Sequence, residues 1–312
     1  MESNFLVEVF AILSTTLRFA TPLIFAAIGG IFSEKSGVIN IGLEGMMIMG
    51  AFFGVWGTHI SNNSLFGILC AIVFAGLTAV IHGILSIFLR ANQVISGIGI
   101  NLFSASITSY LIQKLFGTQG QTAIVNVVPY PTELFSKIPV IGKFLSELNW
   151  FVIGAVLLVV VSWFVLYKTN IGYRIRAVGE HPKAADTLGI NVYKIRFLCV
   201  LLSGVLAGIG GASLSIANVN LFRVGMVSGR GYIALAAMIF GNWKPQTTFV
   251  ACLIFSLSQT FEIVSQKFGF NIPIEIYFMI PYVLTMVAIA FFVRKSNSPL
   301  SLGEFYDKSK RW

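Results

Sequence analysis

The chain has 312 residues, of which 56% are hydrophobic and 11% charged, and its net charge is +9. Soluble globular proteins carry about 25% charged residues, so this chain has too few to cover a water-soluble body. The mean hydropathy of +0.85 indicates an integral membrane protein. Apolar stretches of about 20 residues predict spanning helices rather than barrel strands, so the expected fold class is all-α and polytopic.

The apolar stretches predict about eight to ten spans in chain order. They are Val9–Phe32, Val38–Trp56, Leu65–Leu89, Val94–Phe116, Trp150–Tyr167, Phe197–Ala217, Thr247–Val264 and Ile274–Val293, with Gly231–Phe240 as a shorter candidate for a half-helix. The stretches between them are too short for a soluble domain. Residues 1–312 are therefore expected to form a single transmembrane domain.

Positive charge gathers in the central loop Gly172–Arg196 and in the tail 295–312. Lys and Arg near span ends are retained on the cytoplasmic side, so both segments are expected there, including the C-terminus. Counting crossings places the loop 117–149 and the N-terminus outside, and Thr132–Leu148 is predicted to lie along the outer surface. No basic region is long enough to bind nucleic acid, so the charge favours topology and contact with anionic lipid.

Polar side chains inside the predicted spans each need a reason, because charge at bilayer depth is costly. One interpretation is that they line a substrate path. Asn40 and Glu44, four residues apart in the first turns of the second span and flanked by glycines, are the first candidates, and Asn101 and Gln259 could bond a polar solute.

The alternative interpretation of the same residues is structural. Glu44 would then pair with Arg18 or Arg230 across a helix interface, and the amides would join helices by hydrogen bonds. A lone His82 in an apolar span favours an interhelical hydrogen bond over a proton relay.

Motifs of enzyme sites are missing from the sequence. It contains no HExxH, nucleophile elbow or phosphate-binding glycine loop, and Cys70, Cys199 and Cys252 lie singly in apolar spans. We therefore expect no catalytic residues, no metal and no cofactor.

The central loop predicts a short helix over Lys183–Leu188 that ends at Gly189. Its sequence from Gly179 to Ile190 resembles the coupling loop of ABC importer permeases of the family that serves ribose-type sugars, branched-chain amino acids and nucleosides. Ala184, Ala185 and Gly189 match the family's EAA loop, although Lys183 stands where an acidic residue is usual. The resemblance implies that the ATPase is contacted by Gly179, Glu180, Lys183, Ala184, Ala185, Asp186 and Gly189.

Two further stretches narrow the resemblance. Phe32–Met46 is similar to the signature of the nucleoside branch, as is Ile138–Gly142, and Gly231–Gly241 is similar to a segment shared by the whole family. The resemblance implies a non-catalytic permease in the bacterial plasma membrane. Its implied partners are a separate cytoplasmic ATPase, a second permease, an extracytoplasmic substrate-binding lipoprotein and a small polar solute, most simply a nucleoside.

Two other functions remain open at this point. The first is import of a simple sugar such as ribose or galactose by the same kind of ABC permease. The second is ion-coupled secondary transport, which would use intramembrane carboxylates such as Glu44 and Glu262 and no ATPase.

Overall fold

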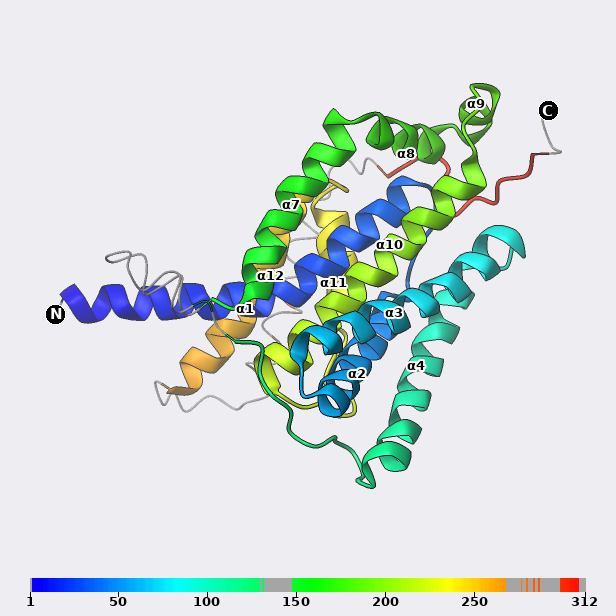
Figure 1. Cartoon of the computed structure of the whole chain (residues 1–312). Coiled ribbons are helices and arrows are strands. Elements are labelled where there is room, and N and C mark those ends of the chain that lie inside the picture. The colour runs from blue at the N-terminus through cyan, green and yellow to red at the C-terminus, as the bar shows by residue number, and fades with distance from the viewer. Residues whose placement is uncertain are drawn as a thin grey trace.

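The protein is an all-helical bundle in a computed structural model that describes residues 2–129, 131, 148–267, 276, 279, 283, 286 and 298–308 (Figure 1). Within these residues extended pairing is limited to one isolated bridge, between Gln121 and Arg223, as the all-α prediction requires. The helices are α1 (Glu2–Lys35), α2 (Leu43–Ser61), α3 (Ser64–Gly83), the π-helix η1 (Ile84–Phe88), α4 (Gln93–Phe116), α7 (Trp150–Lys168), α8 (Asn170–Glu180), α9 (Pro182–Thr187), α10 (Val192–Ala212), the π-helix η2 (Ser213–Val219), α11 (Arg230–Phe240) and α12 (Pro245–Lys267).

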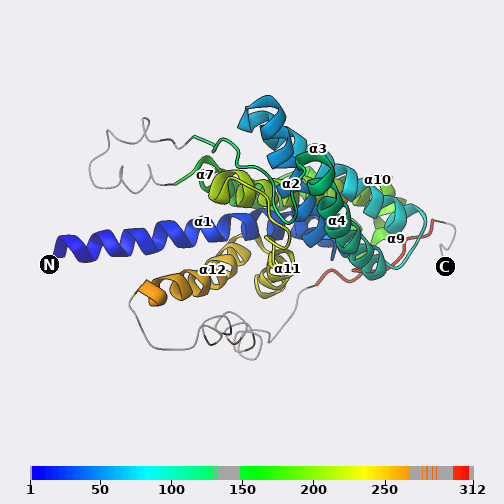
Figure 2. The same cartoon turned by 90° about the horizontal axis from the view of Figure 1, so that it is seen from below.

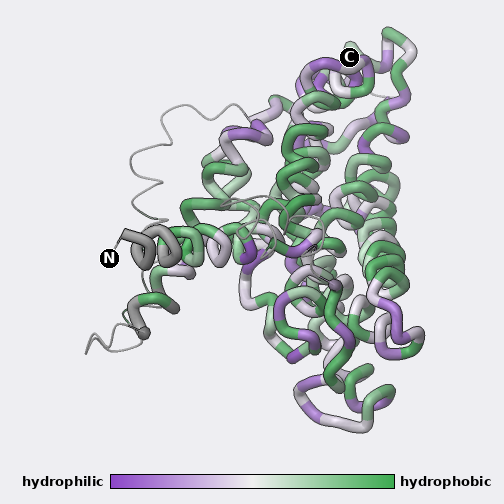
Figure 3. The backbone as a smooth tube through the Cα atoms, turned by 60° about the vertical axis from the view of Figure 1, so that its left-hand side comes forward, coloured by the Kyte–Doolittle hydropathy of each residue, from purple (hydrophilic) through white to green (hydrophobic). Residues whose placement is uncertain are grey.

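Five helical segments of the described residues are long and apolar enough to cross a membrane. They are Val9–Lys35, Ser64–Phe88, Gln93–Phe116, Trp150–Lys168 and Val192–Val219. Helices α2 and α12 have 19 and 23 residues but are not among these five segments, and α11 has only 11. Figure 3 shows the helix bodies mostly in green and the polar residues mostly in the connections and at the end near α9. The predicted span Ile274–Val293 and the predicted surface element Thr132–Leu148 lie almost wholly outside the described residues.

Helix α10 lies at the centre, where it packs against α1, α2 and α3. Glycines make this packing close: a Cβ atom on Gly50 of α2 would overlap the backbone of Gly208 of α10. Small residues allow such approach between membrane helices, where van der Waals packing takes the place of the hydrophobic effect. Small residues recur every four positions in both helices, at Gly50 and Gly54 of α2 and at Gly204, Gly208 and Ala212 of α10, which puts them on one face of each helix.

The break between α1 and α2 differs from its prediction. Helix α1 continues through Lys35, and α2 begins at Leu43, so the buried loop Ser36–Gly42 is not helical. Asn40 therefore does not share a helix face with Glu44, as the second predicted span assumed. Gly37 has a φ of 95°, which ends α1, and side chains of α3 and α4 supply the hydrogen bonds that a helix would have supplied.

The two ends of the bundle have different connections (Figures 1 and 2). At one end α8 and α9 lie outside the spans, and the described tail 298–308, drawn in red, runs beside them. At the other end the segment after α4 pairs with the one after η2, through Thr122 N–H to Phe222 C=O (2.9 Å) and Val125 N–H to Asn220 C=O (2.8 Å). The predicted short helix in the central loop is confirmed as α9.

Candidate functional site

Helix α9 projects from the bundle with one face open to solvent. Lys183, Ala184 and Gly189 are exposed, and Gly189 ends the turn with a φ of 80°. Leu188 is 81% exposed, the highest value among the large hydrophobic residues of the described chain. Single exposed apolar side chains are common on protein surfaces, so Leu188 is a candidate contact only because it lies beside Ala184 and Gly189 in the predicted coupling segment. Leu188 was not among the predicted contact residues, although the sequence shows an apolar residue directly before the glycine that ends the helix.

The opposite face of α9 is packed. Ala185 is 2% exposed and forms a small cluster with Val178, Val192 and Tyr306. Gly179, at the end of α8, is also buried, and a side chain there would overlap the carbonyl group of Lys35 at the end of α1. The seven predicted coupling residues therefore divide between an outward face and an inward one.

The two acidic residues of this segment face the tail. Glu180 Oε2 accepts a hydrogen bond from Leu300 N–H (3.3 Å). Asp186 Oδ1 lies 3.6 Å from Lys308 Nζ. Between α9 and the tail lies a cavity of about 460 Å³ whose lining includes Lys183, Leu300 and Glu304.

Polar side chains of α3 and α4 satisfy the backbone of the loop Ser36–Gly42. Gln93 Oε1 accepts from Ile39 N–H (2.7 Å), and His82 Nε2 donates to the Ile39 carbonyl (3.0 Å). Asn101 Nδ2 donates to the Ile41 carbonyl (3.0 Å). An irregular backbone at membrane depth is tolerated only when such partners exist. His82 therefore has a structural explanation. Gln93 binds the same loop, although its position at the start of a span gave no sign of this in the sequence.

Glu44 holds the start of α11. Its carboxylate accepts from Gly229 N–H (2.8 Å) and from Gly231 N–H (2.6 Å). A Cβ atom on Gly231 would overlap the backbone of Glu44, so only glycine allows this approach. The N-terminus of a helix leaves amide hydrogens unpaired and carries partial positive charge, and the carboxylate satisfies both. Arg230 Nη1 donates to the Met226 carbonyl (3.0 Å).

The four predicted path residues differ in how far their hydrogen bonds are satisfied. Asn101 accepts from Gly45 N–H (2.8 Å) and donates to Ile41 and to the Tyr232 hydroxyl (2.8 Å), so all its polar groups are used. Asn40 donates to Ser203 Oγ (2.7 Å), but its buried Oδ1 has no hydrogen-bond partner. Gln259, half-buried on α12, likewise has a buried Oε1 without a partner.

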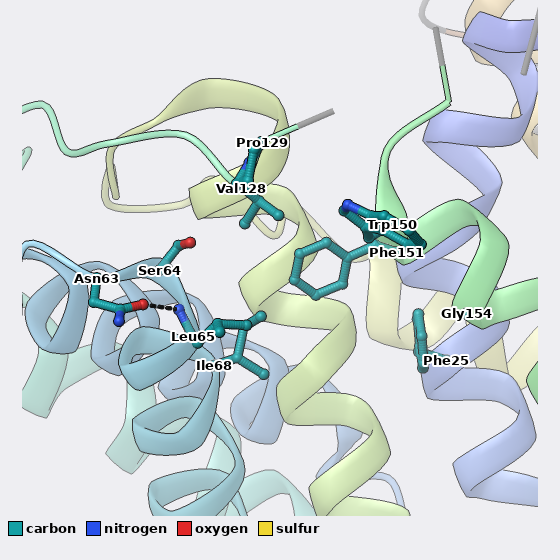
Figure 4. Close-up of a pocket in the computed structure, with 10 residues that line it drawn as sticks. All are labelled: Phe25, Asn63, Ser64, Leu65, Ile68, Val128, Pro129, Trp150, Phe151 and Gly154. Atoms are coloured by element: carbon teal, nitrogen blue, oxygen red, sulfur yellow. Dashed lines mark hydrogen bonds between the residues drawn. The ribbon is translucent and has the colours of Figure 1, made fainter. Parts of the chain in front are cut away.

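A cavity of about 530 Å³ lies at the other end of the bundle (Figure 4). Its walls are mainly apolar and aromatic, with Trp150 and Phe151 of α7 facing Leu65 and Ile68 of α3 across it. The Asn63 side-chain oxygen already accepts from Leu65 N–H (2.8 Å). This cavity therefore offers few polar partners to a solute.

Comparison with known families identifies the chain. The family described as branched-chain amino acid transport system / permease component matches residues 12–290. The chain belongs to this family. It is a multi-pass membrane protein of the bacterial plasma membrane, and members of the family are permease components rather than catalytic subunits.

Several relatives cover nearly all of the chain. The guanosine ABC transporter permease protein NupQ of Bacillus subtilis is 40% identical over 316 residues, which are 96% of this chain and 97% of NupQ. The nucleoside ABC transporter permease protein NupC of Lactococcus lactis is 40% identical over 310 residues, with the same shares. A second guanosine permease of Bacillus subtilis, NupP, is 29% identical over 268 residues, 83% of this chain and 74% of NupP.

A solved structure shares the fold. It is an inward-facing conformation of a metal-chelate type ABC transporter, with a TM-score of 0.51 and 17% identity. The similarity covers 89% of this chain and 85% of that one. At this identity the similarity supports the permease fold alone.

Proposed function

We propose that this chain is a permease subunit of an ATP-driven importer of nucleosides. The observation that carries the proposal is 40% identity, over 96% of the chain, to two permeases whose names specify guanosine and nucleosides. The segment Phe32–Met46, which resembles the nucleoside branch, contains the buried loop and Glu44, so the residues behind that resemblance organise the core.

The proposal extends to the partners, and the same comparison supports one of them, the second permease. Bacillus subtilis has two related guanosine permeases, NupQ and NupP, which supports pairing of this chain with a second, non-identical permease. The exposed face of α9 is the surface for a cytoplasmic ATPase, which puts α9 and the tail in the cytoplasm. A substrate-binding lipoprotein delivers the solute on the outer side.

The structure suggests different roles for the four path candidates. A buried carbonyl oxygen without a donor is costly, so the oxygens of Asn40 and Gln259 are groups that a solute rich in hydroxyl and amino donors satisfies as the path opens. The side chains of Glu44 and Asn101 are occupied by backbone partners and hold the walls of that path.

Uptake measurements test the proposal. Cells with and without the gene receive labelled guanosine, adenosine, uridine or ribose, and energy is removed separately with a protonophore and by ATP depletion. We expect the gene to support nucleoside uptake that needs ATP and survives the protonophore. Loss of ribose uptake alone would move the substrate to a simple sugar, and uptake abolished by the protonophore while ATP remains would indicate ion-coupled transport.

A further inference from the structure

The described tail residues 298–308, here called the strap, are bound to the end of α8. Ser301 N–H and Ser301 Oγ both donate to the Gly179 carbonyl, at 3.0 and 2.6 Å. Leu300 N–H donates to Glu180 (3.3 Å). Ser301 is 3% exposed, so these hydrogen bonds are shielded from water. The strap is therefore attached at the junction from which α9 projects.

The same strap is bound to the buried loop Ser36–Gly42. Gly303 N–H donates to the Gly37 carbonyl (3.1 Å). A Cβ atom on Gly303 would lie 2.9 Å from Ile39 Cδ1, so strap and loop are in direct contact. The loop and α9 are far apart in sequence, and the strap bridges them with backbone groups.

Arg196 of α10 joins loop and strap with one side chain. Its Nε donates to the Ser36 carbonyl (3.1 Å), Nη1 to the Glu304 carbonyl (2.8 Å) and Nη2 to Ser301 Oγ (3.2 Å). The side chain is 3% exposed. The guanidinium is planar and presents its donors in a fixed fork, so it holds its three acceptors in fixed relative positions.

Peripheral contacts complete the attachment. Tyr306 packs into the cluster that contains Ala185 of α9, and Tyr193 Oη donates to the Tyr306 carbonyl (3.2 Å). Asp307 forms an ion pair with Arg90, just before α4, at 2.9 Å. Exposed ion pairs contribute little, so the buried hydrogen bonds and Tyr306 hold the strap.

We propose that the strap and Arg196 transmit movement of α9 to the loop Ser36–Gly42, and so act as positioning elements for coupled transport. The inference rests on the proposed function, because it takes α9 as the helix that the ATPase moves. Displacement of α9 shifts Gly179 and Ser301, Arg196 carries the shift to Ser36, and the loop moves with Asn40. Helix α2 follows the loop, and its Glu44 holds the start of α11. A contiguous set of packed, hydrogen-bonded groups is the physical form that such coupling takes.

The test is uptake per ATP hydrolysed in proteoliposomes that contain the complete transporter. Arg196→Lys keeps the positive charge but lacks the fork, and Arg174→Lys on the exposed side of α8 is the matched control. We expect the Arg196→Lys transporter to assemble with the ATPase and to hydrolyse ATP, while uptake per ATP hydrolysed falls about tenfold. A change of about tenfold is within the range that coupling between two sites typically produces. The control keeps the wild-type ratio.

Ser301→Ala provides a second, milder variant in case Arg196→Lys fails to assemble. It removes the hydroxyl that bridges Gly179 and Arg196 and keeps the Ser301 backbone hydrogen bond. We expect a lower uptake per ATP in this variant as well. An unchanged ratio in an assembled variant would overturn the role of the strap. Absence of ATP-driven nucleoside uptake by the wild-type complex would instead contradict the proposed function, so the two failures are distinguishable.

Discussion

Asn40 and Asn101 are both buried amides near the start of α2, yet their surroundings differ. Asn101 uses its oxygen and both amide hydrogens within the protein, where it holds Ile41, Gly45 and Tyr232 together. Asn40 uses its amide group and leaves its oxygen without a partner. At the scale of single residues, polar character thus marks two roles that only the hydrogen bonds distinguish.

Substitution by alanine separates these roles. Asn101→Ala leaves Gly45 N–H and the Ile41 carbonyl unpaired, so we expect the free energy of unfolding to fall by about 1–3 kcal/mol with the uptake KM unchanged. Asn40→Ala removes a proposed solute contact, so we expect KM to rise about tenfold, the equivalent of one hydrogen bond of ~1.4 kcal/mol. Thermal unfolding of the purified protein and uptake kinetics measure both. A raised KM for Asn101→Ala with normal stability would reverse the assignment.

Helix α9 has six residues and two different faces. Its inward face, at Ala185, is fixed by the cluster with Val178 and Tyr306, and its outward face presents Ala184 and the adjoining Leu188. A helix this short is not stable by itself, so its position comes from packing and from the strap. The outward face is therefore available to a partner without loss of internal packing.

Leu188→Asp tests the outward face. We expect the ATPase to bind the permease at least about tenfold more weakly, because burial of a leucine side chain contributes ~1.5–3 kcal/mol. Stability of the permease itself should stay within about 0.5 kcal/mol, since the side chain is 81% exposed. Ile124→Asp, at a residue 77% exposed at the other end of the bundle, is the control. Equal ATPase binding by Leu188→Asp and wild type would exclude this face as the docking surface.

At the scale of the whole molecule, basic residues gather at the end of the bundle that carries α8 and α9, and the segment after α4 lies at the other end. Arg174, Lys183 and Lys194 lie in or beside α8 and α9, where the strap also lies (Figure 1). Ile124 lies in the segment after α4 at the other end. The positive-inside rule therefore predicts that the α9 end lies in the cytoplasm.

Cysteine labelling checks this orientation. The native Cys70, Cys199 and Cys252 are buried, so they are poorly accessible to a labelling reagent. Single cysteines are introduced by Leu188→Cys or Ile124→Cys in a variant in which these three are replaced. With a membrane-impermeant maleimide, we expect Leu188→Cys to react only in inside-out vesicles and Ile124→Cys only in intact cells. The reverse pattern would invert the topology and remove α9 from reach of a cytoplasmic ATPase.

Most of the spans and the short helix of the central loop could be predicted from sequence, because apolar length and helix-ending glycine are local properties. The start of α2 could not. The pattern Val38–Glu44 predicts a continuous span. In the structure, Gln93, His82 and Asn101 hydrogen-bond to its backbone, so the non-helical loop leaves few backbone groups unpaired. Those partners come from other helices, and their positions relative to the break are tertiary information.

The sequence by itself determined that the chain spans a membrane, which loops carry its basic charge and which stretch resembles a coupling loop. These follow from composition and short motifs, which need no knowledge of neighbours. Only the tertiary structure decided that Glu44 holds α11, that Asn101 is fully bonded while Asn40 is not, and that Arg196 joins the strap to the loop Ser36–Gly42. The reason is that a buried polar group is defined by its partners, and here these partners lie far away along the chain.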